Sequence, residues 1–184
     1  LTSGGRHQGV AAIVRPYQYL PFDQMRVRVA AAPAPPFIIA LDGIEDPQNL
    51  GAVLRTAEGS GALAVVVASR NTSPVTAAVA RASAGAVDRV PMVRVAALPA
   101  TLVALKRDGF KVIGLDGGAT TAYDAADLQD RIVLVAGSEG RGLSRHVHQV
   151  CDVLVGIPLH GAVASLNVSV AVAVVAFELR SQRR

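Results

Sequence analysis

Residues 157–179 read IPLHGAVASLNVSVAVAVVAFEL, and the interpretation of the whole chain depends on this stretch. A polar turn with a glycine stands directly before a long apolar segment. Residues 168–174 alternate valine with serine or alanine, a period of two that is typical of a strand. The apolar run is long for a strand, contains no turn residue and ends in arginines, where cations stabilise a helix C-terminus. We therefore predict a helix, which must be buried because it is apolar on nearly every side.

A membrane span is the alternative interpretation of this region. No residue between Asp152 and Glu178 carries a formal charge, and a spanning helix needs only ~20 apolar residues. However, proline, histidine, glycine and asparagine interrupt the run, and only about ten apolar residues follow Asn167, which is typical of a core helix. We predict that the helix is buried by the core and by a second copy of the chain, without membrane association.

The composition describes one domain with a core of small aliphatic side chains. Of the 184 residues, 51% are apolar but only 4% are aromatic, and tryptophan is absent. A chain of this length can bury a substantial core. The scarcity of rings argues against base stacking on aromatic side chains as a binding mode.

The charge is modestly positive and is carried almost entirely by arginine. The net charge is +4, and sixteen of the eighteen basic residues are arginines, whose forked guanidinium groups suit phosphate. This balance is compatible with nucleic-acid binding but is also common elsewhere. Cys151 is the only cysteine, which excludes an internal disulfide and suits a reducing compartment. Because no apolar signal segment opens the chain, we predict a cytoplasmic location.

The chain divides by composition near residue 37. Residues 1–36 are predicted to be a linker and N-terminal extension, with a proline-rich hinge at 30–36. Within it we expect a short strand at 10–14 and an element of uncertain type at 21–29.

From residue 37 onward, apolar strands alternate with helices. Strands are predicted at 37–42, 63–68, 92–95, 111–116, 132–136 and 153–157, and helices at 49–59, 75–83, 98–108 and 143–150 in addition to the final one. Continuous apolar strands separated by helices predict a mainly parallel sheet covered on both faces.

Four loops rich in glycine and small polar residues follow predicted strands. They are DGIEDPQN at 42–49, DGGATT at 116–121, GSEGRG at 137–142 and PLHGAVAS at 158–165. The carboxyl ends of parallel strands meet at one edge of the sheet, where ligands of such sheets bind. The sequence therefore predicts a site built from these loops.

Asn49 and Arg55 are the first candidate site residues. Six residues apart on a helix, they differ by roughly 120° in direction and can flank one site. Asn49 would then bind substrate and Arg55 would reach a phosphate. The alternative makes Asn49 a helix N-cap and Arg55 a solvated surface residue, and spacing alone favours this alternative.

The loop 137–142 lacks both the Walker pattern and the G-x-G-x-x-G order of dinucleotide sites. Its glycines allow the backbone to approach a flat ligand closely. Glu139 either pairs with an arginine such as Arg55 or merely precedes the next helix. Ser165 is an N-cap candidate, whereas Asn167 would be a poorly placed polar group unless it had a partner.

A metal site is not predicted. His146, His148 and Cys151 share one short helix, but no further ligands that would complete a site are evident nearby. A solvated helix face is the favoured interpretation.

Three stretches resemble, in order and spacing, the three motifs of the SpoU/TrmH family of RNA ribose 2′-O-methyltransferases. They are LDGIEDPQNLGAVLRTAEGSGA at 41–62, VLVAGSEGRGLS at 133–144 and the stretch 157–179. The resemblance runs from about residue 37 to the C-terminus. The HQG at 7–9 is similar to the linker of the branch that methylates a guanosine of 23S rRNA.

This resemblance implies an α/β knot, in which a parallel sheet is flanked by helices and the C-terminal segment forms a deep trefoil knot that binds S-adenosylmethionine. Topological rules alone would exclude this fold, because true knots are almost absent from proteins. The resemblance also implies a homodimer formed through the C-terminal helix region. Residues 37–184 would be the catalytic domain, and 1–36 would connect it to an N-terminal RNA-binding domain of the kind that related proteins often carry.

The resemblance also assigns the site residues. The catalytic residues would be Asn49, Arg55, Glu139, Ser165 and Asn167. Cofactor contacts would fall, mostly through the backbone, on Gly137, Ile157 and Leu166, with Leu115 lining the pocket. In this family the motif-one arginine is the favoured base, yet an arginine stays protonated near neutrality and accepts protons poorly. Arg55 is therefore expected to be essential either as the base or as a phosphate clamp.

The function implied is methylation of a ribose 2′-hydroxyl in RNA with S-adenosylmethionine as cofactor, on a guanosine of 23S rRNA. A tRNA ribose methyltransferase and a non-catalytic RNA-binding module of the same fold are the alternatives. An oxidoreductase with a nucleotide cofactor is disfavoured by the missing dinucleotide fingerprint.

Overall fold

The computed structural model describes residues 15–183. The strand predicted at 10–14 and the HQG at 7–9 lie outside the described residues. A seven-stranded sheet forms the centre of the molecule, with the strands in the order β3-β2-β1-β6-β4-β7-β5. All neighbouring strands pair in parallel. The strands are β1 (Phe37–Asp42), β2 (Ala64–Ala68), β3 (Met92–Val95), β4 (Lys111–Leu115), β5 (Thr121–Ala122), β6 (Ile132–Gly137) and β7 (Val153–Gly156).

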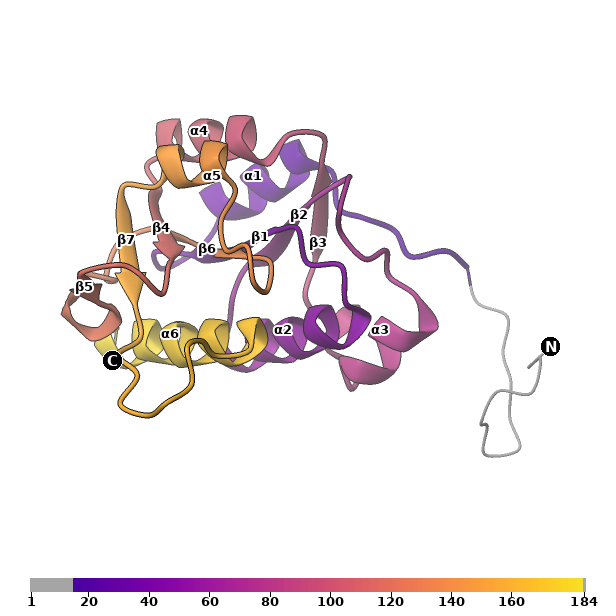
Figure 1. Cartoon of the computed structure of the whole chain (residues 1–184). Coiled ribbons are helices and arrows are strands. Elements are labelled where there is room, and N and C mark those ends of the chain that lie inside the picture. Colours follow the sequence, from indigo (N-terminus) through magenta and orange to yellow (C-terminus); the bar gives the residue numbers. More distant parts are fainter. Residues whose placement is uncertain (1–14, 184) are drawn as a thin grey trace, which may run out of the picture.

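Helices cover both faces of this sheet, so that the predicted layered α/β architecture is confirmed (Figure 1). On one face lie α2 (Pro47–Ser60), α3 (Ala77–Ala82) and α6 (Val168–Gln182). On the other face lie α1 (Phe22–Ala30), α4 (Leu98–Arg107) and α5 (Arg145–Val150). Two short 3-10 turns, η1 (Ala86–Asp88) and η2 (Tyr123–Ala125), complete the elements.

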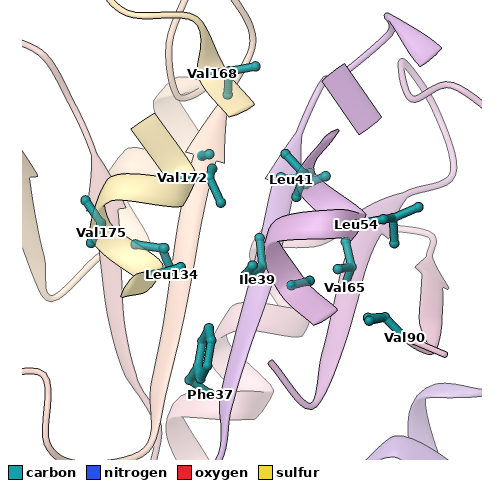
Figure 2. Close-up of a cluster of buried hydrophobic side chains, with 14 of the residues drawn as sticks. Phe37, Ile39, Leu41, Leu54, Val65, Val90, Leu134, Val168, Val172 and Val175 are labelled. Carbon is teal, nitrogen blue, oxygen red and sulfur yellow. The ribbon is translucent and has the colours of Figure 1, made fainter. Parts of the chain in front are cut away.

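The core is aliphatic, as the composition predicts. Along β1, Phe37, Ile39 and Leu41 face the layer of α2 and α6, whereas Ile38 and Ala40 face the opposite layer. Figure 2 shows the cluster of buried side chains between the sheet and the layer of α2 and α6. In it, valines of α6 pack beside Leu134 of β6 and the side chains of β1. Both faces of the central strands are therefore buried, which explains why these strands lack an alternating polar pattern.

The chain differs from the sequence-based expectation mainly at the ends of elements. Asp46, and not Asn49, is the N-cap of α2, because its carboxylate accepts a hydrogen bond from the Gln48 amide at 2.9 Å. Pro47 then occupies the first helical position, where its missing N–H costs nothing. The uncertain element at 21–29 is helix α1, and Met25 on it is fully buried.

The final helix is α-helical over Val168–Gln182, as predicted, and it packs on α2 and on β6. Residues between β4 and β6 hold its C-terminal end. Gln182 bonds to the backbone of Ala126 and Leu128, and Arg183 donates to the carbonyls of Leu128, Asp130 and Pro35. The trefoil knot itself stays a prediction.

Burial of α6 is one-sided. Val172, Val175 and Leu179 are fully buried, but Val170 and Phe177 are 47% and 52% exposed. None of the helices within residues 15–183 is long and apolar enough for a membrane span.

Candidate functional site

The loops after β1, β4, β6 and β7 meet at the carboxyl edge of the sheet, as the sequence predicts. Because β1 and β6 pair in register, Asp42 lies opposite Gly137, and the first and second motifs begin side by side. Strand β4 lies between β6 and β7, which brings the loop after Leu115 to the same edge. Three motifs that are far apart in the sequence are thus neighbours in space.

A cavity of about 1070 Å³ lies among these loops. It is lined by the ends of β4, β6 and β7, by the loop after β4 and by residues 157–168. All four predicted cofactor contacts line it, namely Leu115, Gly137, Ile157 and Leu166. Of the predicted catalytic residues, Glu139, Ser165 and Asn167 line the same cavity. Its volume lies slightly above the ~300–1,000 Å³ typical of small-molecule sites.

The turn after β6 passes very close to the strand that it leaves. A Cβ atom added at Gly137 would lie 2.0 Å from the carbonyl carbon of Gly142, so only glycine fits there. The amide of Gly142 donates to the Ser138 carbonyl at 2.9 Å and closes the turn. Gly140 and Gly142 have positive φ angles of 78° and 65°, which glycine adopts without strain. The loop therefore presents backbone to the cavity, with Glu139 at its tip.

Asn167 connects the three motifs. Its Nδ2 donates to Oε1 of Glu139 at 2.6 Å and to Oδ1 of Asn49 at 2.9 Å. Its Oδ1 accepts from the backbone amide of Ser169 at 2.9 Å and so caps helix α6. The sequence analysis expected Asn167 to need a hydrogen-bond partner, and the structure provides two, Glu139 and Asn49. The N-cap of α6 is Asn167, and the alternative that made Ser165 the cap is wrong.

Asn49 is the most buried polar residue of this group, with 8% of its surface exposed. Its Oδ1 accepts the bond from Asn167, whereas its Nδ2 donates to no residue within the described part of the chain. In that part, no fully buried side-chain nitrogen or oxygen lacks a hydrogen-bond partner. The Asn49 amide nitrogen therefore keeps accessible surface, and Asn49 lines a second, smaller cavity beside the first.

Arg55 stands apart from the other predicted site residues. It is exposed on α2 and lines neither this cavity nor the second one described below. Glu139 bonds to Asn167, and no ion pair between Glu139 and Arg55 occurs among residues 15–183. The predicted alternative of a Glu139–Arg55 pair is therefore not the arrangement of this structure.

A second cavity of about 380 Å³ adjoins the first and was not predicted from the sequence. The two cavities share Ser138, Glu139, Gly142 and Val168 as walls. The remaining lining comes mainly from the loop after β1 and from the residues after Gly142, including Asp42, Glu45, Asp46, Asn49, Asn71 and Arg141. A signal for it exists in the sequence, because Asp42 and Asp46 flank a loop at the end of a buried strand.

Two aspartates of the site are held by hydrogen bonds from backbone amides. Asp42 accepts from the Ser144 amide at 2.7 Å, and Asp116 accepts from the Gly118 amide at 2.8 Å. The second carboxylate oxygen of Asp116 lies 3.4 Å from Nε2 of His148. Within residues 15–183, no three Cys, His, Asp or Glu side chains are grouped so that they would hold a metal ion.

Comparison with known proteins identifies the family. The model of the SpoU rRNA methylase family matches residues 36–177. An uncharacterized tRNA/rRNA methyltransferase of Mycobacterium avium is 45% identical over 184 residues, which is all of this chain and 59% of that protein. The chain thus spans 57–59% of the length of the curated relatives that it matches.

Solved structures agree with this match. The SpoU methyltransferase AviRb of Streptomyces viridochromogenes, in complex with AdoMet, is 26% identical with a TM-score of 0.75 over 82% of this chain and 59% of that one. The structure of an RNA 2′-O ribose methyltransferase is 27% identical with a TM-score of 0.73 over 96% of this chain and 61% of that one. With its three motifs meeting at one edge of a parallel sheet, the chain belongs to the SpoU rRNA methylase family.

Proposed function

We propose that this protein is an S-adenosylmethionine-dependent RNA methyltransferase that modifies a ribose 2′-hydroxyl, on a guanosine of 23S rRNA. The observation that carries the proposal is the cavity of about 1070 Å³ with Asn167 bonded to Glu139 and Asn49 at its wall. Family membership and the AdoMet complex of AviRb support the cofactor. The similarity to a solved RNA 2′-O ribose methyltransferase supports the 2′-oxygen as the target.

The residues of the cavity fit this cofactor. Leu115, Ile157 and Leu166 offer apolar walls for a purine, and the glycine turn after Gly137 offers backbone donors and acceptors. Gly156 also lies close to the carbonyl oxygens of Asp116 and Ala119, which would lie 3.1 and 3.2 Å from an added Cβ. When bound there, S-adenosylmethionine supplies a methyl group on a positively charged sulfur.

The residues of the chain would act mainly by orienting the reacting groups and less by contributing charge. Transfer of that methyl group to a ribose 2′-oxygen would require a base to take up the hydroxyl proton, and the chain would hold the reacting groups in line. The apolar walls would limit the access of water, and Asn49 and Glu139 are held by Asn167 beside the cavity. Orientation of this kind provides a large share of the rate when the reacting groups are held in line.

Arg55 would act from the exposed side of α2. We propose that it clamps a phosphate of the RNA or takes part in removing the hydroxyl proton. In the clamp role its forked guanidinium matters, and lysine is a poor substitute. Arg55→Lys is expected to lower turnover by at least about tenfold without a change in cofactor affinity. Near-normal turnover with unchanged cofactor affinity would contradict both roles.

The assembly proposed is a cytoplasmic homodimer in which the C-terminal helix region meets its copy. The exposed apolar side chains of α6, Val170 and Phe177, support this interface. We also propose residues 37–184 as the catalytic domain, which the family match over 36–177 supports.

The test separates cofactor, reaction and target. Calorimetry with S-adenosylmethionine and NAD is expected to show binding of the first alone. Transfer of radiolabelled methyl to 23S rRNA, followed by digestion to nucleosides, is expected to yield 2′-O-methylguanosine. Transfer to tRNA alone would move the target to tRNA, and cofactor binding without transfer to any RNA would favour the non-catalytic module.

A further inference from the structure

We propose that the second cavity is the nucleobase subsite of this site and that Glu45 selects guanine there. The inference rests on the proposed function. It names the part of the substrate that this cavity takes and the residue that distinguishes one base from another. At about 380 Å³ the cavity lies within the range of small-molecule sites.

The position of the cavity suits a base whose ribose is at the first cavity. Ser138, Glu139, Gly142 and Val168 line both cavities and form the wall between them. A nucleotide with its base in the second cavity therefore places its ribose at this wall, next to the proposed cofactor cavity. The wall is also where Asn167 holds Glu139.

The charge of the cavity argues against a phosphate and for a neutral group rich in hydrogen-bond donors. Four carboxylates line it, those of Asp42, Glu45, Asp46 and Glu139, against the single guanidinium of Arg141. This excess of negative charge repels an anion. A divalent cation is not favoured either, because residues 15–183 contain no group of three acidic, histidine or cysteine side chains that would hold one.

Among these four carboxylates of the described chain, Glu45 is the one with neither oxygen in a hydrogen bond. Asp42 accepts from the Ser144 amide, Asp46 accepts from the Gln48 amide, and Glu139 accepts from Asn167. Glu45 is exposed and takes part in no hydrogen bond or ion pair with another residue of the described chain. Both of its oxygens are therefore free to accept bonds from a ligand.

Asn49 is the second residue at this cavity with a group that is free to bind a ligand. It is 8% exposed, and its Nδ2 donates to no described residue while its Oδ1 is held by Asn167. The free amide nitrogen keeps accessible surface, and Asn49 lines this cavity. An accessible donor on a residue that lines the cavity is available to a ligand acceptor, such as a base carbonyl oxygen.

These two groups together fit guanine better than the other bases. Guanine presents two adjacent donors, N1–H and the N2 amino group, which one carboxylate accepts in parallel. Beside them lies the O6 acceptor, which suits the Asn49 amide. Adenine and cytosine pair one amino donor with an adjacent ring acceptor, and uracil has a single donor between two acceptors, so a carboxylate meets one donor at most.

The experiment measures base preference by binding, so that it does not depend on methyl transfer. The trinucleotides UGU and UIU, in which inosine lacks only the N2 amino group, are titrated into ¹⁵N-labelled protein without cofactor. We expect the side-chain amide of Asn49 and the backbone amides of Glu45 and Gly142 to shift, with UGU bound on the order of tenfold more tightly than UIU.

Two variants decide the role of Glu45. Glu45→Gln has the same shape but carries a donor in place of one acceptor oxygen, and we expect the UGU to UIU ratio to fall to about one. Glu58→Gln is the matched control, because Glu58 lies on the surface of α2 and lines neither cavity of the site. Its ratio is expected to equal that of the wild type.

Four results would overturn the inference: no shift at these amides, shifts confined to another surface, equal affinity for UGU and UIU in the wild type, or an unchanged ratio in Glu45→Gln. Failure of the proposed function has a different signature, namely no calorimetric binding of S-adenosylmethionine. A guanine preference that persists without cofactor binding would keep the subsite and reject the methyltransferase.

Discussion

Asn167 performs a structural and a site role with the two ends of one amide group. Its oxygen caps α6 through the Ser169 amide, and its nitrogen holds Glu139 and Asn49. The two roles use different atoms, so that substitutions can separate them. This makes Asn167 the most informative position at the scale of single residues.

Asn167→Asp keeps a capping oxygen but removes the donor and places a second carboxylate beside Glu139. We expect a melting temperature near that of the wild type, because aspartate caps as well as asparagine. Methyl transfer should fall by at least about tenfold, since the Glu139 carboxylate is released and repelled. Thermal unfolding and methyl-transfer kinetics measure the two effects.

Asn167→Ala is the comparison, because it removes both roles. Loss of the cap is expected to lower the free energy of unfolding by about 1 kcal/mol. If Asn167→Asp lost as much stability as Asn167→Ala, the cap would not be the main structural role.

Cys151 allows the effect of burial on a single side chain to be tested. Its thiol is half-buried and donates to the Val147 carbonyl at 3.3 Å. Burial, with a smaller contribution from Asp152, raises the pKa of the Cys151 thiol from 9.0 to about 11. The neutral thiol is therefore favoured, and at pH 8 the reactive thiolate fraction falls by roughly a hundredfold relative to an unperturbed thiol.

Alkylation by iodoacetamide should be slow at pH 8 and rise steeply towards pH 11. The same protein in denaturant is the control and should react at the rate of a free cysteine. A native rate at pH 8 equal to the denatured one would show that the thiol is neither buried nor displaced in pKa.

Helix α2 shows at the element scale how packing decides the effect of a residue. It contains two glycines, Gly51 in its interior and Gly59 next to its last residue, and helix propensity alone would favour alanine at Gly51 by up to ~1 kcal/mol and at Gly59 by less. Their surroundings differ. A Cβ at Gly51 would lie 2.4 Å from Cβ of Ala82 on α3, whereas one at Gly59 would lie 3.5 Å from the Phe177 ring.

Gly51→Ala is expected to lower the free energy of unfolding by about 1–2 kcal/mol, because overpacking against the α3 backbone exceeds the gain in propensity. Gly59→Ala is expected to raise it by about 0.5 kcal/mol, because its new methyl group makes an ordinary contact. Urea unfolding measures both. Destabilisation of equal size in both variants would mean that the close α2–α3 contact is not responsible.

At the scale of the whole molecule, the final helix covers one face of the sheet and still exposes apolar surface. Val170 and Phe177 lie seven residues apart, which places them on one face of α6. We propose that a second copy of the chain covers these exposed side chains.

Phe177→Glu is expected to shift the protein from dimer to monomer, because a buried charge at an apolar interface is unfavourable. Val27→Glu is the matched control, since Val27 is 70% exposed on α1, on the opposite face of the sheet. Sedimentation velocity at several concentrations measures the association. A dimer that persists in Phe177→Glu, or a wild type that is monomeric, would contradict the proposed interface.

Much of the architecture followed from local patterns. Apolar strands such as 37–42 and the final helix were predicted because strand burial and helix capping leave signals within a few residues. Element ends were less accurate, as the N-cap of α2 shows, because Asp46 and Asn49 are both good capping residues. The helical state of 22–30 was missed, because its burial depends on contacts with distant parts of the chain.

The sequence by itself determined the parallel α/β layers, the four loops at one edge and, through its three motifs, the family. Only the tertiary structure decided which polar groups meet there: Asn167 joins Asn49 and Glu139, Arg55 lies outside both cavities, and a second, acidic cavity shares a wall with the first. The physical reason is the separation along the chain over which each effect acts. Propensity and periodicity act between neighbours in the chain, whereas a hydrogen bond between residues 118 positions apart depends on the register of the whole sheet.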